Sequence, residues 1–419
     1  MVSLGCPKNT VDTELALGDL VQNGYEITPD AKEADVIIVN TCGFIEPAKR
    51  ESINAILDMA RLKSESKCQK LVVTGCLSER YSEELLQEIP EIDLILGVNQ
   101  YPELKRLLTE PNLESSRDHA HDPASYYESY AHRALTTPFY SAYLKLGEGC
   151  SFQCAFCSIP RIRGVFRSRP LESILEETRY LAAQGVREFN MVSQVTNLYG
   201  ADLKMKDGLE QLLKSLCEVD GVDWLRLMYC YPSFVDERFL SVIAGQEKVC
   251  NYIDVPLQHT HDEMLKSMKR QETEGGVRKM LDEVRLKIPD VALRTTFITG
   301  FPGETETHFR HMVRFLCEME FDHVGIFTYS DEEGTTAYDY PDRVLQEVKE
   351  ERKNILMEFQ KEVVLRKNRD RIGRVESVLV EGFDPQENYL MTGRLASQAP
   401  DIDGQVLLEK CEAEPGQII

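Results

Sequence analysis

Three cysteines close together are the first residues whose type and spacing could do chemistry. Cys150, Cys154 and Cys157, here called the first triplet, follow the pattern C-x3-C-x2-C. One short loop of this kind can wrap a corner of an iron–sulfur cluster, because thiolates are the soft ligands that such clusters need. No fourth cysteine is adjacent, so one iron would keep an open position. A structural zinc site needs four ligands and buried thiols have no reason to cluster, so we favour a cluster over both alternatives.

Cys6, Cys42 and Cys76, here called the second triplet, are far apart in the sequence. Each comes just after the C-terminal end of a predicted parallel strand, and ligands of open α/β sheets bind in the crevice at those ends. One such cysteine alone would be a small core residue. Three cysteines that each follow a strand end in the same way favour a shared metal site, again with three thiolates and one iron that has an open position. The other six share no spacing and are predicted to be packing residues: Cys68, Cys217, Cys230, Cys250, Cys317 and Cys411.

The elements that must hold the triplets follow from the apolar pattern, which predicts an α/β protein. Residues 1–109 alternate short apolar runs with helical patterns and predict an open parallel α/β sheet. Residues 110–138 are polar without periodicity and predict a linker. Residues 139–370 contain six strand–helix units and an exit helix, and predict a barrel or partial barrel with its site at the C-terminal strand ends. Residues 371–419 have short β runs broken by Gly, Pro and Asn, which predict a small β-barrel.

Apolar periodicity also places the individual elements. In the first segment it predicts helices over residues 12–22, 47–62 and 79–88, and a long charged helix near 343–369 leaves the barrel. The predicted strands cover residues 36–39, 71–73 and 92–96 of the first segment and 142–146, 188–192, 224–229, 252–255, 293–298 and 323–328 of the barrel.

The charge of the chain narrows the choice of partner. Its 419 residues carry 70 acidic and 48 basic side chains, a formal net charge of −22. A surface this acidic repels nucleic acid and attracts a basic protein. No stretch is apolar enough to span a bilayer. We therefore expect a cytoplasmic protein with no membrane partner, whose twelve cysteines are not paired in disulfides because that compartment is reducing.

Several motifs carry a resemblance to a known family. The first triplet, with Phe156 before its third cysteine, matches the defining motif of the radical S-adenosylmethionine (SAM) superfamily, which implies a partial (β/α)6 barrel. Together with the other motifs, the whole chain resembles the radical SAM methylthiotransferases, which end in a TRAM domain. The matching motifs are SLGCPKN at 3–9, NTCGFI at 40–45, VTGC at 73–76 and GFPGET at 300–305.

Within this family the chain resembles most closely the ribosomal-protein branch, the RimO type. GCPKN at residues 5–9 is similar to that branch, whereas the tRNA-modifying branch usually has GCQMN. His259 follows Leu-Gln, where the tRNA enzymes commonly have serine. Residues 371–419 carry four basic and nine acidic side chains, which suits a basic substrate better than RNA. Val195 stands where the branch usually has aspartate. Both chain ends look short of the family pattern, so we expect the TRAM-like module to be truncated.

The resemblance implies two 4Fe–4S clusters and SAM. The cluster on the first triplet would cleave SAM, and the cluster on the second would present the sulfur that is transferred. The product would carry a methylthio group on the β-carbon of an aspartate in the twelfth protein of the small ribosomal subunit, a basic protein. Cofactor contacts are implied for Phe156, Gln194, Gly300 and Gly303, and an electron donor, an unidentified reductase or flavodoxin-like protein, is needed. No catalytic residue is assigned beyond the cluster ligands.

Two rival functions and two side-chain groups stay open at this point. A tRNA adenosine methylthiotransferase would use the same clusters, and a non-catalytic metal-binding scaffold would keep only the cysteines. His259 could face the substrate or be structural. Four arginines within nine residues could contact the SAM carboxylate or an acidic substrate, or pair with the protein's own carboxylates: Arg161, Arg163, Arg167 and Arg169.

Overall fold

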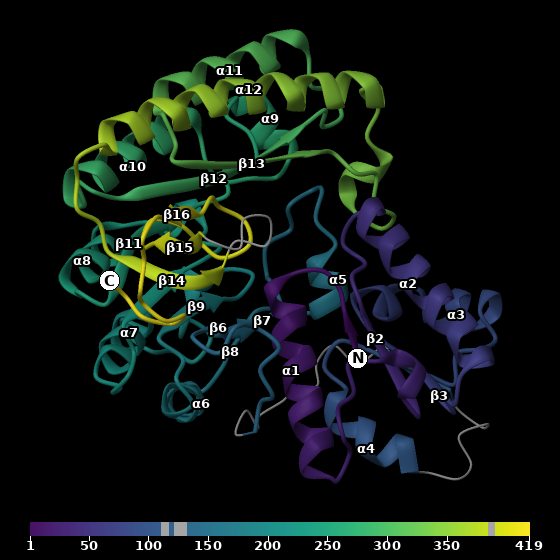
Figure 1. Cartoon of the computed structure of the whole chain (residues 1–419). Helices are drawn as coiled ribbons and strands as arrows, with labels where there is room; N and C mark the ends of the chain where they lie inside the picture. The colour runs from purple at the N-terminus through teal and green to yellow at the C-terminus, as the bar shows by residue number, and fades with distance from the viewer. Residues whose placement is uncertain (110–116, 121–131, 384–389) are drawn as a thin grey trace.

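The computed structural model describes residues 1–109, 117–120, 132–383 and 390–419. Its β-strands form a five-stranded sheet near the N-terminus, a six-stranded sheet in the middle and a three-stranded sheet near the C-terminus, with one two-stranded ribbon. In Figure 1 the N-terminal part lies beside the central part, and helix α5 lies between them. The C-terminal strands, in yellow, pack against the central part. The fold class is therefore α/β, as the sequence predicted.

The N-terminal sheet is parallel throughout, with the strands in their order along the chain. Helices cover both faces of its inner strands, which is why β2, β3 and β4 contain continuous apolar runs. Ile37 and Val73 face the helices α2 and α3, and Ile38 and Val72 face α1 and α4. The strands are β1 (Val2–Ser3), β2 (Val36–Thr41), β3 (Lys70–Gly75), β4 (Leu94–Leu96) and β5 (Asp118–His119). The helices are α1 (Pro7–Gln22), α2 (Glu46–Glu65), α3 (Cys76–Glu88) and α4 (Tyr101–Thr109).

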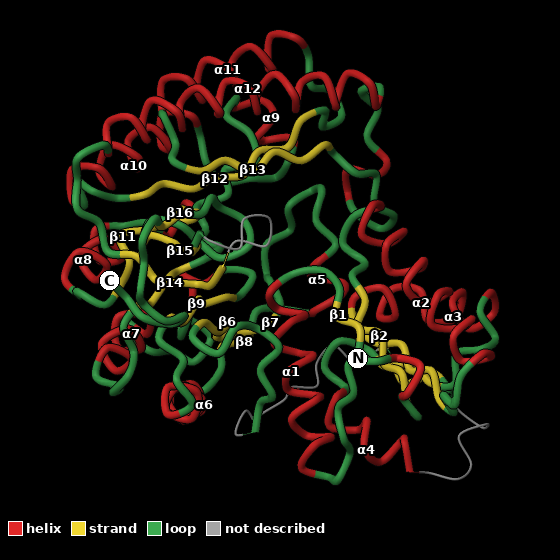
Figure 2. The backbone as a smooth tube through the Cα atoms, in the orientation of Figure 1, coloured by secondary structure: helices red, strands yellow, loops and turns green. Residues whose placement is uncertain are grey.

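The central sheet is also parallel and curls into a partial barrel, with the order β13-β12-β11-β10-β9-β6. Figure 2 shows these strands in yellow with helices on the outer side. The strands are β6 (Ser141–Lys145), β9 (Glu188–Val192), β10 (Trp224–Leu227), β11 (Val249–Asp254), β12 (Ala292–Thr299) and β13 (His323–Thr328). The helices are α5 (Ile159–Arg163), α6 (Leu171–Ala183), α7 (Gly208–Cys217), α8 (Glu237–Gly245), α9 (Asp262–Ser267), α10 (Glu274–Lys287), α11 (Glu306–Met319) and α12 (Gln346–Arg371).

The C-terminal sheet is antiparallel and consists of β14 (Val378–Phe383), β15 (Met391–Leu395) and β16 (Val406–Leu408). A buried ion-pair group joins it to the barrel. Arg394 on β15 donates from Nη2 to Oε2 of Glu188 on β9 at 2.6 Å and from Nη1 to Oε1 at 3.0 Å. Arg226 on β10 donates to the same carboxylate at 3.0 Å. Burial alone would raise the pKa of Glu188, but Arg394 and then Arg226 lower it to about 2.

Glu188→Gln is expected to lower the free energy of unfolding by about 3 to 5 kcal/mol at pH 7, because it leaves the buried guanidinium of Arg226 without its carboxylate and leaves Arg394 with Glu381 alone. A carboxyl whose pKa is lowered on folding stabilises the protein above its unfolded pKa, here 4.5. The difference between wild type and variant should therefore shrink as the pH falls from 4.5 toward about 2. Urea unfolding at several pH values measures this difference.

The matched control is Glu210→Gln, which removes an exposed pair with Lys214 at 2.7 Å. This change should lower the free energy of unfolding by less than about 1 kcal/mol. Equal losses for Glu188→Gln and Glu210→Gln would contradict the role given to the buried group.

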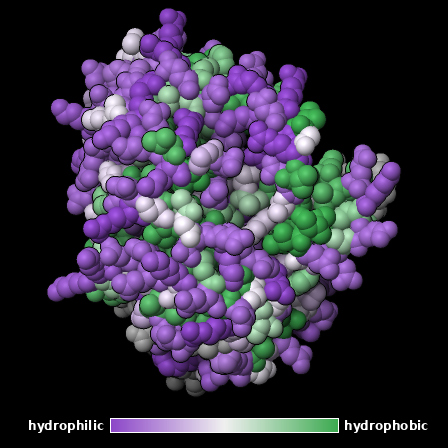
Figure 3. Space-filling model, turned by 90° about the vertical axis from the view of Figure 1, so that its left-hand side faces the viewer, coloured by the Kyte–Doolittle hydropathy of each residue, from purple (hydrophilic) through white to green (hydrophobic). Residues whose placement is uncertain are grey.

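The structure differs from the sequence predictions in short elements. A two-stranded ribbon that the apolar pattern did not predict is formed by β7 (Gly147–Glu148) and β8 (Arg167–Ser168). The predicted linker supplies β5, which pairs with β4, while residues 110–116 and 121–131 of that linker lie outside the described residues. Within the described part of the chain, no helix is both long and apolar enough to cross a membrane. The face shown in Figure 3 is mostly hydrophilic, with smaller apolar areas between.

Candidate functional site

The first triplet lies on the loop between β7 and α5, close to the C-terminal end of β6. The loop begins at Gly149, whose φ is +74° and whose missing Cβ would lie 2.2 Å from the carbonyl oxygen of Val165. Only glycine allows this close approach. The loop then turns, since the N–H of Cys157 donates to the carbonyl of Cys154 at 3.1 Å. All three cysteines are half-buried, so the loop presents them to one partly exposed corner.

The thiols of the first triplet influence one another electrostatically. Burial, and then the neighbouring charge of Cys154, raise the pKa of Cys157 to about 12. Burial also raises the pKa of Cys150. Three thiols on one short loop fit the donor set of an iron–sulfur cluster with an open iron. Because ligands bind as thiolates, loading with iron would release protons at this loop.

The second triplet is assembled by three strands of the N-terminal sheet. Cys6 precedes α1, Cys42 follows β2, and Cys76 begins α3 directly after β3. Glycines let these segments approach. A Cβ on Gly5 would lie 2.8 Å from Cβ of Cys42 and 3.1 Å from its sulfur, and a Cβ on Gly43 would lie 2.8 Å from the carbonyl oxygen of Cys76. The strand ends therefore bring the three thiols to one rim of the sheet.

The pKa values of the three cysteines of the second triplet shift in different directions. Burial raises the pKa of Cys42 to about 12, helped by the charge of Cys76, and burial raises the pKa of Cys76. Burial opposes ionisation of Cys6 as well, but Lys8 and Arg163 together lower its pKa. The close packing of Gly5 on Cys42 and of Gly43 on Cys76 brings the three chain segments together, and three thiols on one rim are a donor set that fits a cluster site. Cys6 is the one whose thiolate the protein itself favours.

A buried charged group, here called the bridging network, lies between the two triplets. Arg163 on α5 donates from Nη1 to Glu148 at 2.9 Å and from Nη2 to Asp12 at 3.2 Å and to Asn9 at 2.6 Å. Lys145 pairs with Glu148 at 2.8 Å and also with Asp12. Burial alone would raise the pKa of Glu148, but Arg163 and Lys145 lower it. Since Asn9 and Asp12 belong to α1 and the others to the barrel, this network ties the two units together.

The four predicted cofactor contacts lie around the first triplet loop and the strand ends. Phe156 packs against a buried apolar cluster, and Gln194 donates to Glu148 at 3.1 Å and so joins the bridging network. Gly300 and Gly303 have φ of +72° and +83°. A Cβ on Gly300 would lie 2.2 Å from the Lys349 side chain, so packing explains this glycine, whereas Gly303 is open. Their contacts with SAM stay predictions.

The structure shows the partners of two of the four arginines and of His259, while the roles of Arg161 and Arg167 stay predictions. Arg163 and Arg169 are buried and bind the protein's own carboxylates, Arg169 pairing with Glu177 at 2.6 Å. His259 is 1% exposed, and its Nδ1 accepts from the backbone N–H of Thr260 at 2.8 Å. Burial lowers the pKa of His259. Burial and the bond to Thr260 favour the structural role of this histidine over contact with the substrate. Val195, which stands where the branch usually has aspartate, is a buried core residue with 2% exposure.

A group of histidines on α9 and α11 brings metal-ligating atoms together, since His261, Glu263 and His308 offer atoms within 4.8 Å of one another. Nδ1 of His308 accepts from the backbone N–H of Thr305, and Nδ1 of His261 accepts from that of Glu263. A neutral imidazole bound to a metal through Nε2 carries its proton on Nδ1, so an ion would displace both contacts. We interpret this group as helix capping with an ion pair.

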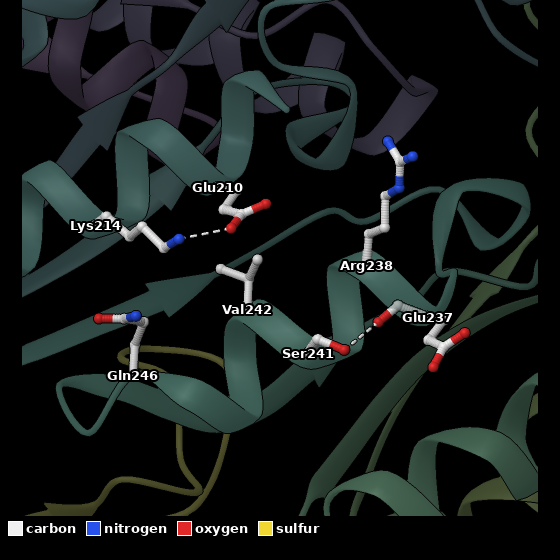
Figure 4. Close-up of a pocket in the computed structure, with 7 residues that line it drawn as sticks. All are labelled: Glu210, Lys214, Glu237, Arg238, Ser241, Val242 and Gln246. Carbon is white, nitrogen blue, oxygen red and sulfur yellow. Dashed lines mark hydrogen bonds and ion pairs between the residues drawn. The ribbon is translucent and has the colours of Figure 1, made fainter. Parts of the chain in front are cut away.

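One surface pocket lies between α7 and α8, as Figure 4 shows. Its lining is mostly polar and includes Glu210, Lys214 and Arg238, with Val242 as its apolar member. Neither triplet contributes a residue to it. The pocket therefore has no part in the candidate site.

The bridging network was missed in the sequence. Asn9 lies in a recognised motif and Asp12 follows three residues later, but nothing in their spacing points to Lys145, Glu148 or Arg163. The one available signal was that Arg163 follows the first triplet closely.

Comparison with protein-family models gives three matches along the chain. Residues 1–97 match the uncharacterized protein family UPF0004, residues 144–316 match the radical SAM superfamily, and residues 372–419 match the TRAM domain. Radical SAM enzymes hold a 4Fe–4S cluster and SAM. The radical SAM match includes the first triplet.

Curated relatives match over the whole chain. The ribosomal protein uS12 methylthiotransferase RimO of Geobacter sulfurreducens is 47% identical over 423 residues, covering 100% of this chain and 94% of the relative. The protein of the same name from Acetivibrio thermocellus is 44% identical, covering 98% of this chain and 92% of the relative. Among solved structures, the radical S-adenosylmethionine methyltransferase TsrM from Kitasatospora setae has a TM-score of 0.58 at 18% identity, covering 77% of this chain and 70% of that one. This structural likeness confirms the fold.

Proposed function

The chain belongs to the family of the ribosomal protein uS12 methylthiotransferases, the RimO type of radical SAM enzyme, and from this premise we propose that it transfers a methylthio group to the β-carbon of an aspartate in ribosomal protein uS12. The observation that carries the proposal is the pair of cysteine triplets on two units of the fold, with the bridging network between them. A scaffold would need neither two sets of thiols with an open position nor a fixed relation between them.

We propose two 4Fe–4S clusters, one on each triplet. When bound, the cluster on the first triplet together with SAM supplies a carbon radical that can remove hydrogen from an unactivated C–H bond, and the cluster on the second supplies the sulfur. The protein's own residues do the rest. The loop at Gly149 shapes the first site, the strand ends at Gly5 and Gly75 shape the second, and Arg163 with Glu148 holds the units in register. Cofactors carry the hard chemistry while the fold orients them.

The division of labour along the chain is part of the proposal. Residues 1–109 form the methylthiotransferase N-terminal unit, residues 110–138 a linker, residues 139–370 the radical SAM barrel with its exit helix, and residues 371–419 the TRAM-like module. That module has four basic and nine acidic side chains, which would attract a basic ribosomal protein and repel tRNA. The substrate places the reaction in the cytoplasm, where a reductase or a flavodoxin-like protein would supply electrons.

The proposal predicts that the chain, expressed in a bacterial strain without its own enzyme of this kind, restores one methylthio group on uS12. Intact-mass analysis of ribosomal proteins and nucleoside analysis of tRNA from the same cells measure the two possible products. Cells that express the Cys150→Ala variant provide the control, because that protein should lack the first cluster. Methylthiolated tRNA beside unmodified uS12 would overturn the choice of substrate.

A further inference from the structure

Each triplet has one buried guanidinium within hydrogen-bond reach of a sulfur. Nη2 of Arg163 lies 3.6 Å from Sγ of Cys76, and Nη1 of Arg270 lies 3.9 Å from Sγ of Cys154. Within the described residues, these are the two hydrogen bonds that join an arginine to a cysteine of a triplet. Arg163 belongs to α5 of the barrel and Cys76 to α3 of the N-terminal sheet, so its contact crosses between the units.

Both guanidinium groups are held in fixed orientations. Arg163 has its other bonds to Glu148, Asp12 and Asn9, and its side chain is 1% exposed.

Arg270 pairs with Glu272 at 3.1 Å, donates to the carbonyl oxygen of Pro256 at 3.1 Å and lies 4.2 Å from the ring centroid of Tyr231. Its side chain is 5% exposed. Because both guanidinium groups are buried and held by several partners, each positive charge has a fixed position next to a cysteine sulfur.

A fixed cation beside a ligating sulfur acts on the electronic state of a cluster. Reduction adds negative charge, and both the N–H···S bond and the positive charge stabilise the more negative form. The effect is strong where water is excluded, because the local dielectric constant is low. A buried arginine at a ligand sulfur therefore raises the reduction potential of the cluster that the sulfur holds.

We propose that Arg163 is a positioning residue that sets the reduction potential of the cluster on the second triplet, and that Arg270 does the same for the cluster on the first. The inference rests on the proposed function, since it requires a cluster on each triplet. Arg163 acts across the junction of the two units, so the potential of the second cluster depends on how the barrel is docked. Arg270 acts within the barrel and gives the matched case.

The test is a redox titration of the full-length, anaerobically reconstituted protein, followed by electron paramagnetic resonance. Arg163→Gln removes both the charge and the donor fork, and Arg163→Lys keeps the charge. In Arg163→Gln the reduced-to-oxidised ratio of the second cluster at a fixed potential should fall about tenfold, or about 59 mV for a one-electron couple. The shift should be smaller in Arg163→Lys, and the first cluster should not shift in either.

Reciprocal variants and cluster-free variants assign the signals. Arg270→Gln should shift the first cluster and leave the second unchanged. Variants that lack one triplet identify which signal belongs to which cluster. If Arg163→Gln does not hold the second cluster, Arg163→Lys is measured in its place.

Three results would overturn the inference. The first is an unchanged reduction potential of the second cluster in Arg163→Gln, and the second is an equal shift of both clusters. The third is loss of the second cluster from both Arg163 variants, because a residue that only donates to one ligand sulfur is not needed to retain the metal. A wild-type protein with only about four iron atoms per chain would instead contradict the proposed function, so the two failures can be told apart.

Discussion

Replacing Cys150 by alanine should give a protein that no longer cleaves SAM and holds about four iron atoms per chain where the wild type holds about eight. Two thiolates cannot keep a four-iron cluster that already lacks a fourth protein ligand, so the loss should be complete. Without that cluster no electron reaches SAM, and 5′-deoxyadenosine should fall to background. Iron and sulfide analysis of anaerobically reconstituted protein, with chromatography of the nucleoside, measures both effects.

Cys317→Ala is the matched control for this experiment. Cys317 is an exposed cysteine on α11, outside both triplets, and its removal should leave the iron content and SAM cleavage unchanged. A Cys150→Ala protein that still held about eight iron atoms would show that the first triplet is not the ligand set.

Replacing Cys76 by alanine should separate the two halves of the reaction. The first cluster stays, so about four iron atoms per chain and formation of 5′-deoxyadenosine should persist. Transfer of the methylthio group to uS12 should fall below detection, because the site that presents sulfur is gone. Mass analysis of uS12 beside the nucleoside assay distinguishes this outcome from that of Cys150→Ala, in which both activities disappear.

Cys68→Ala controls for the loss of a buried thiol in the same unit, in the segment between α2 and β3. Cys68 is 7% exposed and packs in the core of the N-terminal unit, so its removal can lower stability but should not remove iron. Equal iron and equal transfer in Cys76→Ala and wild type would show that the second triplet does not bind a cluster.

Local pattern was enough for most of the fold. The apolar run at residues 36–39 predicted β2 (Val36–Thr41), because a strand buried on both faces is largely apolar. The prediction at 188–192 matches β9 (Glu188–Val192), although Glu188 and Asn190 in this strand are buried polar residues. Boundaries were less exact, since α1 begins at Pro7 and not near residue 12. Proline suits the first turn of a helix, where its missing N–H has no partner to lose, and this signal was overlooked.

Short pairings could not be predicted from the sequence. Strand β5 (Asp118–His119) is polar and two residues long, and it is defined by pairing with β4. The ribbon of β7 and β8 likewise depends on partners that lie 19 and 21 residues apart along the chain, Glu148 with Arg167 and Gly147 with Ser168. Elements of this length have no periodicity of their own, because two residues cannot repeat a pattern.

The sequence by itself predicted which cysteines would hold iron, and it determined the order of the strands that carry them. The first triplet is a local pattern, and the second follows from the rule that parallel strands end at one rim of a sheet, so neither needed coordinates. Only the tertiary structure decided what surrounds them. Asp12 and Arg163 meet in a buried pair although 151 residues separate them, and Arg163 reaches Cys76 across two units. A contact of this kind depends on how finished units dock, and the residues that make it need no common spacing along the chain.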